Sequence, residues 1–237
     1  MRRIGILGGC SPESTVEYYR HLTRGYVERF GDHAYPEIVV YSVSFQRFID
    51  WMRTGDWDSL AAGIIEGLRS LDAAGAEAGV IASNTFHRVF DEVSGAMRGT
   101  PLRMISLLDV VAERLADLGC RRAGLLGTGI TMAEAFYPDR FAREGIETAV
   151  PDEEDRRVVD RIIFEELSRG RVTEAARARV LEISGRLIEA GADGLILGCT
   201  ELPQLIQEGD FPVPILDTTA LHAAAALDGA IASKPSS

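Results

Sequence analysis

A cysteine stands at the end of an apolar segment in the stretch Gly194-Leu195-Ile196-Leu197-Gly198-Cys199-Thr200-Glu201. The apolar residues predict a buried strand that ends at Gly198, and Thr200 followed by Glu201 is typical of a helix start. A thiol in that position is favoured as thiolate, because the positive end of a helix stabilises the anion. The pattern predicts a cysteine that acts as a base or nucleophile; a buried structural cysteine is the alternative.

The same arrangement occurs earlier in the chain, with Ser83 in the place of the cysteine. The stretches AAGAEAGVIASNT and EAGADGLILGCT each combine Ala-Gly-Ala, an acidic residue, an apolar segment and a small hydroxyl or thiol residue. A matching strand precedes each copy, and 75 positions separate Gly8 from Ser83 where 72 separate Gly127 from Cys199. This repeat predicts two similar α/β halves, with Ser83 and Cys199 at equivalent positions in one shared cleft.

Apolar segments that alternate with helical patterns predict the elements around these residues. Strands are expected at 3–8, 37–44, 80–82, 102–107, 123–127, 148–151, 194–197 and 214–216. Helices are expected from a cap at Ser11 or Ser14 to about Phe30, at 57–74, after Asn84 as its cap, at 109–118, 131–144 with an interruption at Pro138, 155–168, 173–190 and 220–231. This alternation predicts an α/β fold with parallel sheets, in which ligands bind beyond the carboxyl ends of the strands.

The repeat also predicts two domains. The first is expected to comprise residues 1–99 together with 208–237, because the last strand and helix follow the second copy and should return to the first domain. The second is expected to comprise residues 100–207. Residues 233–237 (SKPSS) are expected to form a disordered tail.

Composition limits the classes of partner. The 237 residues are 46% hydrophobic and 26% charged, as in soluble globular proteins. A net charge of −11 disfavours nucleic-acid and anionic-membrane partners, and no apolar run approaches the roughly 20 residues that span a bilayer. The N-terminal MRRIGILGG is not expected to be a signal peptide, because it breaks at a Gly-Gly pair. Three cysteines without metal-ligand spacing predict a reducing, cytoplasmic setting and no metal.

Four segments, GILGGCSPEST, IASNTFH, LLGT and LGCTELP, resemble in this order the cofactor-independent aspartate/glutamate racemases, and the resemblance extends through FEELSRG and ILDTTALHA. Glu201 after Cys199 and Thr200 is similar to the aspartate racemase branch. The resemblance implies two Rossmann-like domains related by a pseudo-twofold axis, an active site between them and a homodimer. It also implies an amino-acid substrate whose α-proton is removed by one thiolate and returned on the opposite face by a second thiol, without PLP or metal.

Serine replaces the first of those two cysteines in this chain. We therefore expect Cys199 to be the principal acid and base, with Ser83 on the opposite face of the substrate. A serine hydroxyl is a poor base without an activating partner, and His87, four residues on, is either that partner or a packing residue. Three functions follow: a racemase of aspartate, glutamate or a related amino acid; a single-cysteine decarboxylase or isomerase; or a non-catalytic amino-acid-binding relative.

An α-carbanion beside a carboxylate needs preorganised hydrogen-bond donors. Helix starts and strand ends supply Asn84, Thr85, Thr128 and Thr200, each of which is alternatively a helix cap. The resemblance adds pocket-lining positions, so the expected substrate-binding residues are Gly9, Cys10, Asn84, Thr85, Thr128, Thr200 and Glu201. Related aspartate racemases bind the substrate's side-chain carboxylate with a basic pair, whose neighbourhoods here hold Gln46 and Arg47, and Glu165 and Glu166.

Overall fold

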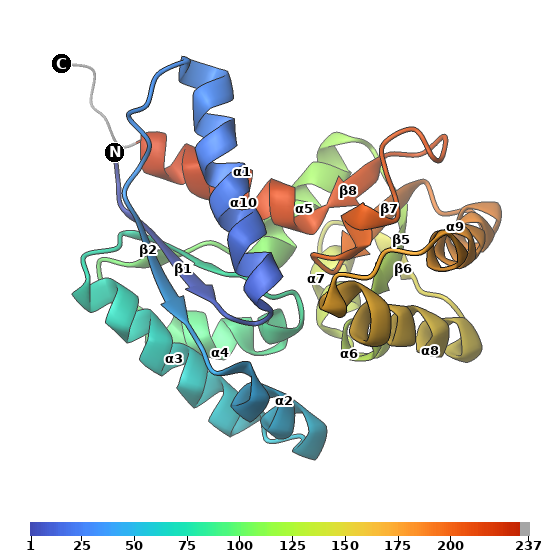
Figure 1. The fold of residues 1–237 in the computed structure, drawn as a ribbon, viewed down its shortest axis with the longest axis horizontal. Coiled ribbons are helices and arrows are strands. Elements are labelled where there is room, and N and C mark those ends of the chain that lie inside the picture. Colours follow the sequence, from blue (N-terminus) through green and yellow to red (C-terminus); the bar gives the residue numbers. More distant parts are fainter. Residues whose placement is uncertain (233–237) are drawn as a thin grey trace. The chain divides into compact units, whose positions relative to one another are not determined.

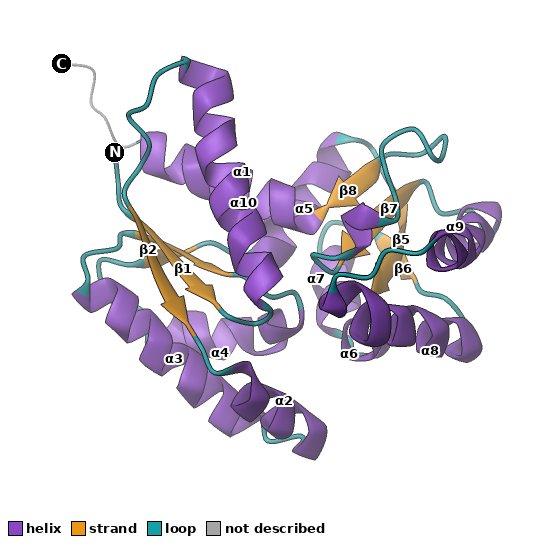
Figure 2. Cartoon of the chain, in the orientation of Figure 1, coloured by secondary structure: helices purple, strands orange, loops and turns teal. Residues whose placement is uncertain are grey.

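The computed structural model describes residues 1–232, and strands alternate with helices along the chain (Figure 1, Figure 2). The tail expected at 233–237 lies outside the described residues. The chain divides into two compact units: unit 1 holds Met1–Leu107 and the segment from Thr219 onward, and unit 2 holds Leu108–Thr218. Within residues 1–232, no helix is both long and apolar enough to cross a bilayer.

Each unit is built on a sheet of four parallel strands. In unit 1 the order is β2-β1-β3-β4, with β1 Ile4–Gly8, β2 Ile38–Ser42, β3 Ala78–Ile81 and β4 Arg103–Met104. In unit 2 the order is β6-β5-β7-β8, with β5 Arg122–Gly127, β6 Glu147–Ala149, β7 Gly194–Gly198 and β8 Ile215–Asp217. The predicted α/β fold with two similar halves is confirmed, since both sheets repeat one strand order.

The expected return of the last strand to the first domain is wrong. β8 pairs with β7, with Leu216 beside Ile196, and so completes the second sheet. Likewise β4, expected beyond the domain boundary, pairs with β3 in the first sheet. Each fourth strand lies beside the third strand of its own sheet, because the repeat extends one strand further than the matching motifs. Of the last two elements, only helix α10 (Thr218–Ile231) packs into unit 1.

Helices cover both faces of the first sheet. Helix α1 and α10 pack on Ile4, Ile6 and Val80, while α2, α3 and α4 cover the face of Leu7 and Ile81. The remaining bounds in this unit are α1 Pro12–Phe30, α2 Phe45–Thr54, α3 Trp57–Ala73, the 3-10 helix η1 Thr85–Val89 and α4 Phe90–Ala96. Of the two expected caps, Ser11 starts helix α1, because its hydroxyl accepts the Ser14 amide and Pro12 opens the first turn.

Unit 2 follows the same plan with more broken helices. Its elements are α5 Leu107–Asp117, α6 Gly129–Ala133, α7 Phe136–Ala142, α8 Glu153–Arg161, the π-helix η2 Ile162–Glu166, the 3-10 helix η3 Leu167–Arg169, α9 Glu174–Glu189 and the 3-10 helix η4 Leu202–Gln204. Leu126, Leu195 and Leu197 pack against α6, α8 and α9. The interruption expected at Pro138 lies slightly earlier, between α6 and α7, because proline is tolerated in the first turn of α7.

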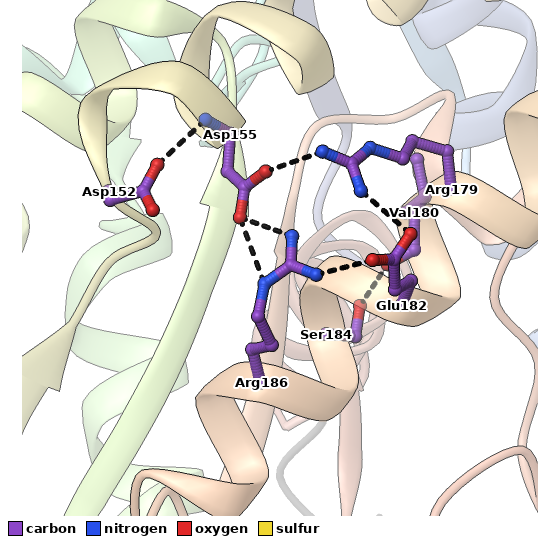
Figure 3. A network of polar contacts seen from close by, with 7 residues as sticks. All are labelled: Asp152, Asp155, Arg179, Val180, Glu182, Ser184 and Arg186. Atoms are coloured by element: carbon purple, nitrogen blue, oxygen red, sulfur yellow. Dashed lines mark hydrogen bonds and ion pairs between the residues drawn. The ribbon is translucent and has the colours of Figure 1, made fainter.

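A buried carboxylate fastens α8 to α9 (Figure 3). Asp155 is 5% exposed, and its amide donates to Asp152, which caps α8. Arg179 donates to Asp155 Oδ1 at 3.0 Å, and Arg186 donates two hydrogen bonds to Oδ2. Glu182 accepts from both arginines at 2.7 Å. The network fixes two helices that pack on one face of the second sheet.

The first strand of each half, β1 or β5, ends in a glycine covered by a threonine. A Cβ on Gly8 would lie 2.5 Å from Thr15 Oγ1, and one on Gly127 would lie 2.8 Å from Thr131 Cγ2. Both threonines belong to the helix that follows the strand. The internal duplication therefore extends to the packing at the carboxyl edge of each sheet, where the predicted site residues begin.

Candidate active site

Cys199 follows β7 directly and is 8% exposed. Its thiol donates a hydrogen bond to Glu201 Oε2 at 2.9 Å, and the Thr200 hydroxyl donates to the same oxygen at 2.7 Å. Glu201 is itself 4% exposed, so this hydrogen bond joins a buried thiol to a buried carboxylate. Sequence reasoning placed Glu201 among the substrate-binding residues and missed its contact with the thiol.

The expected stabilisation of a Cys199 thiolate by a helix is wrong. Only the three-residue turn η4 follows, and Glu201 at its start makes no side-chain cap. Burial raises the pKa of Cys199 well above its usual value, the Glu201 carboxylate raises this pKa further, and the amides of Glu201 and Thr200 offset only part of the rise. The resting side chain is therefore a neutral thiol, because burial and the Glu201 carboxylate outweigh the amide donors of the short 3-10 turn.

The buried phenol of Tyr137 interacts electrostatically with the Cys199 thiol. Tyr137 in α7 is fully buried, and its pKa is raised first by burial and then by the negative charge that Cys199 would carry. Sequence reasoning did not single out Tyr137, since an aromatic residue beside a proline gives no chemical signal. The site in unit 2 therefore contains a thiol, a carboxylate and a phenol in largely dry surroundings.

Thr128 reaches the same edge of the second sheet. Gly127 pairs with Gly198, so the residues that follow them, Thr128 and Cys199, leave neighbouring strands together. The Thr128 hydroxyl accepts the Thr131 amide at 3.4 Å, and the Gly129 amide donates to Asp160 at 2.6 Å. In this structure Thr128 is a helix cap, which was the alternative to its expected role in substrate binding.

Ser83 follows β3 in unit 1 and is partly buried. Its hydroxyl accepts the Phe86 amide at 3.4 Å, whereas Asn84 makes no side-chain cap, so the expected capping by Asn84 is wrong. Asn84 and Thr85 are 6% and 8% exposed and begin η1 rather than a regular α-helix. Ser83, Asn84 and Thr85 thus form one turn at the end of the strand.

His87 is engaged with the main chain rather than with the Ser83 hydroxyl. Its Nδ1 lies 2.8 Å from the Ser83 carbonyl oxygen, and its Nε2 accepts the Leu107 amide at 3.1 Å. This pattern places the proton on Nδ1, which donates to the carbonyl. The ring is 2% exposed and stacks on Phe90, so the packing role is correct and activation of the Ser83 hydroxyl by His87 is wrong for this geometry.

The turn after β1 lies beside the turn that holds Ser83. Gly9 adopts φ 82°, a conformation that favours glycine, and its amide donates to Thr15 at 2.8 Å. Cys10 is partly exposed, and burial of its thiol raises the pKa far above the usual value, so it is a poor nucleophile. The Ser14 hydroxyl donates to the Ala82 carbonyl at 3.1 Å and joins the two turns.

Of the four residues named near the expected basic pair, Arg47 is the cationic one. Arg47 is exposed, with its guanidinium 4.9 Å from the Trp51 ring, and Gln46 donates to Asp50. In unit 2, Glu166 accepts from Thr173 at 3.0 Å next to the π-helix. No group of three His, Cys, Asp or Glu side chains within residues 1–232 is arranged to hold a metal ion.

Known proteins share this fold and sequence along nearly the whole chain. A Yersinia pestis protein of known crystal structure, provisionally named an Asp/Glu racemase, is 38% identical, with a TM-score of 0.89 and coverage of 98% of this chain and 100% of that one. An aspartate racemase homologue from Pyrococcus horikoshii is 36% identical, with a TM-score of 0.84 and coverage of 97% and 99%. The broad specificity amino-acid racemase RacX of Bacillus subtilis is 26% identical over 92% of this chain and 93% of its own length. Because residues 7–226 also match the profile of the Asp/Glu/hydantoin racemase family, the chain belongs to that family.

Proposed function

We propose that this protein is a PLP-independent amino-acid racemase in which Cys199 is the principal acid and base and Ser83 serves the opposite face of the substrate. The observation that carries the proposal is the 2.9 Å hydrogen bond from the Cys199 thiol to Glu201. The pKa of this thiol is raised, and the hydrogen bond provides a nearby carboxylate to which the thiol proton can pass. Aspartate, glutamate or a related amino acid is the proposed substrate, with RacX as a relative of broad specificity.

The proton balance follows from the Cys199–Glu201 pair. At rest the pair holds one proton, on sulfur. When that proton moves to Glu201, the thiolate can take the α-proton of the substrate and leave a carbanion beside the carboxylate. A water held by Ser83 gives a proton to the other face and forms the enantiomer, and the proton on Glu201 neutralises the hydroxide that is left, so the pair again holds one proton, on sulfur. The reverse direction uses the Cys199 thiol as acid. Amides and hydroxyls of Asn84, Thr85, Thr128 and Thr200, together with Gly9 and Cys10, are the proposed carboxylate-binding and pocket-lining groups.

Because a serine stands at position 83, the two directions of racemisation should have unequal rates. Its hydroxyl can donate a hydrogen bond or hold a water that supplies a proton, and the ring of His87 is already bound to backbone groups. We therefore expect rapid α-hydrogen exchange from one enantiomer and slow conversion from the other. The equilibrium constant between enantiomers stays one, so the asymmetry appears in kcat and KM separately. A reducing cytoplasm, proposed from the three free cysteines, would keep Cys199 available as a thiol.

The decisive experiment follows α-deuteration by proton NMR in D₂O, with L- and D-aspartate and L- and D-glutamate as substrates. We expect exchange in the wild type and none in Cys199→Ala. Glu201→Gln should slow exchange by roughly 10²-fold or more, as loss of a general base does, while the exposed Glu208→Gln control should match the wild type. Absence of exchange with every amino acid, or full activity in Cys199→Ala, would overturn the proposal. Release of CO₂ from a malonate-type acid would then favour the decarboxylase alternative.

A further inference from the structure

Backbone and side-chain hydrogen bonds hold the turn that carries Ser83. The Ser83 amide donates to the Ile81 carbonyl at 2.8 Å, and the Ser83 carbonyl oxygen lies 2.8 Å from Nδ1 of His87. These two contacts fix the peptide planes on either side of the Ser83 Cα. The hydroxyl oxygen accepts the Phe86 amide at 3.4 Å, which fixes the side chain. Because the oxygen is the acceptor in that contact, the hydroxyl proton can be donated to a ligand or a water.

His87 is itself held from two sides. Its Nε2 accepts the Leu107 amide at 3.1 Å, and its ring stacks on Phe90 with 5.1 Å between the ring centroids and 10° between the ring planes. Since Nε2 is an acceptor, the proton of the neutral ring is on Nδ1, which donates to the Ser83 carbonyl. The ring is buried, and a hydrogen bond in such surroundings is electrostatically stronger than one in water.

The backbone segment that His87 binds is anchored to the first sheet and to α10. The Ile105 amide donates to the Gly79 carbonyl at 2.9 Å, which continues the pairing of β3 with β4. The Ile105 carbonyl accepts from Nε2 of His222 at 2.9 Å, and the ring of His222 meets the ring of His87 edge to face at 5.6 Å. The segment to which His87 is bound therefore has a fixed place relative to the sheet.

We propose that His87 is a positioning residue, whose Nδ1–H group holds the Ser83 carbonyl and thereby sets where the Ser83 hydroxyl holds its water. This inference rests on the proposed function, in which that water supplies the proton on the second face of the substrate. His87 acts through the backbone of Ser83 and exchanges no proton with the substrate. A displacement of about 1 Å can slow a reaction by about 10²-fold. Loss of the contact should therefore impair proton delivery on the Ser83 face and leave the Cys199 face unchanged.

The partition of one carbanion between two products measures this effect. In D₂O, the enantiomer that Cys199 deprotonates gives a carbanion with two fates. Deuterium returns from Cys199, after its thiol has exchanged with solvent, and gives deuterated substrate, or deuterium arrives from the Ser83 face and gives the enantiomer. Proton NMR measures the first product and chiral chromatography the second, both at early times. Substrate binding and deprotonation are common to both products and cancel in their ratio, so a variant that is only less stable keeps the wild-type ratio.

Two amide substitutions separate the two contacts of His87. An asparagine places its Nδ2 group near the position of the imidazole Nδ1 and can still donate to the Ser83 carbonyl, whereas a glutamine reaches the position of Nε2 and keeps the contact with the Leu107 amide instead. Both remove the ring and its stacking on Phe90, so each is the packing control for the other. We expect His87→Gln to raise the ratio of deuterated substrate to enantiomer about 10-fold or more, and His87→Asn to stay near the wild type. The exposed His33→Gln should match the wild type.

A double substitution tests whether His87 acts through Ser83. Ser83→Ala should raise the ratio by itself, and the addition of His87→Gln should change the ratio no further. A further change in the double variant would overturn the proposal. An unchanged ratio in His87→Gln, or a change in His87→Asn without one in His87→Gln, would also overturn it.

The outcomes separate this inference from the proposed function. A wild type that exchanges neither enantiomer, or an unchanged ratio in Ser83→Ala, would overturn both, whereas an active wild type with an unchanged ratio in His87→Gln alone would overturn the inference only. Thermal melts identify variants that do not fold. Nitrogen NMR of the wild type needs no variant: the His87 ring should carry its proton on Nδ1, and a proton on Nε2 in its place would overturn the proposal.

Discussion

Protonation of a buried histidine should set the acid stability of unit 1. His222 in α10 is fully buried, its Nε2 donates to the Ile105 carbonyl at 2.9 Å, and its Nδ1 accepts from the Tyr18 hydroxyl at 2.7 Å. The other titratable group facing it is His87, at a ring distance of 5.6 Å. Burial, followed by the charge that His87 would carry, lowers the pKa of His222 to about 3, against a smaller rise from the hydrogen bond to Ile105.

The sign of the effect follows from this lowered pKa. In the unfolded chain the imidazole takes up a proton below its ordinary pKa of about 6.5, whereas the folded protein stays neutral down to about 3. Stability is therefore present above pH 6.5 and is lost as the pH falls. Between pH 7 and pH 5 this one group should remove about 2 kcal/mol from the free energy of unfolding.

Urea unfolding at pH 7 and pH 5 measures that loss. The perturbation is His222→Gln, which does not titrate and keeps an amide in reach of the Ile105 carbonyl. Gln should lower stability at pH 7, because Tyr18 loses its imidazole partner, and its further loss on going to pH 5 should be smaller than the wild type's by about 2 kcal/mol. The exposed His33→Gln control should retain the wild-type difference. Equal pH dependence in wild type and His222→Gln would refute the assignment of this acid sensitivity to His222.

Three further substitutions test other parts of the structure. Asp155→Asn should lower the free energy of unfolding by about 2–4 kcal/mol, because two arginines lose a buried carboxylate, whereas the exposed partner change Glu182→Gln should cost under about 1 kcal/mol in the same urea assay. Gly67→Ala should cost about 1–3 kcal/mol, since a Cβ there would press on Leu7 and Tyr41, while Gly185→Ala, with open space around its Cβ, should gain up to about 1 kcal/mol. Glu201→Gln should lower the pKa of the Cys199 thiol and speed its alkylation by iodoacetamide at pH 8, even though turnover falls; unchanged alkylation would contradict the electrostatic role of Glu201.

Local sequence patterns predicted most of the fold because strands and capped helices are local signals. Ser11 and Pro12 marked the start of α1, and the repeated apolar segments marked β1, β3, β5 and β7. The assignment of β8 to a sheet failed, because three residues carry no information about which neighbour they hydrogen-bond. The same limit applies to the internal repeat, because its fourth strands, β4 and β8, occupy equivalent positions in the two sheets but have little sequence in common.

The sequence predicted the local position of Cys199 and not its electrostatic surroundings. Cys199 does follow a strand, but its protonation state depends on Glu201 and on burial, which spacing along the chain does not reveal. The sequence left two roles open for His87, and only the positions of its two ring nitrogens distinguish them. Tyr137 lies 62 positions from Cys199, so only the folded structure relates the two residues.

The placement of α10 has a consequence for synthesis on the ribosome. Unit 2 is one continuous segment, Leu108–Thr218, and all of its strands are available once that segment has emerged. Unit 1 instead needs Ala223, Ala226 and Leu227 to close the core over Ile4, Ile6 and Val80. During translation the second unit can therefore finish folding first, while one face of the first sheet is covered by α1 alone until α10 is made.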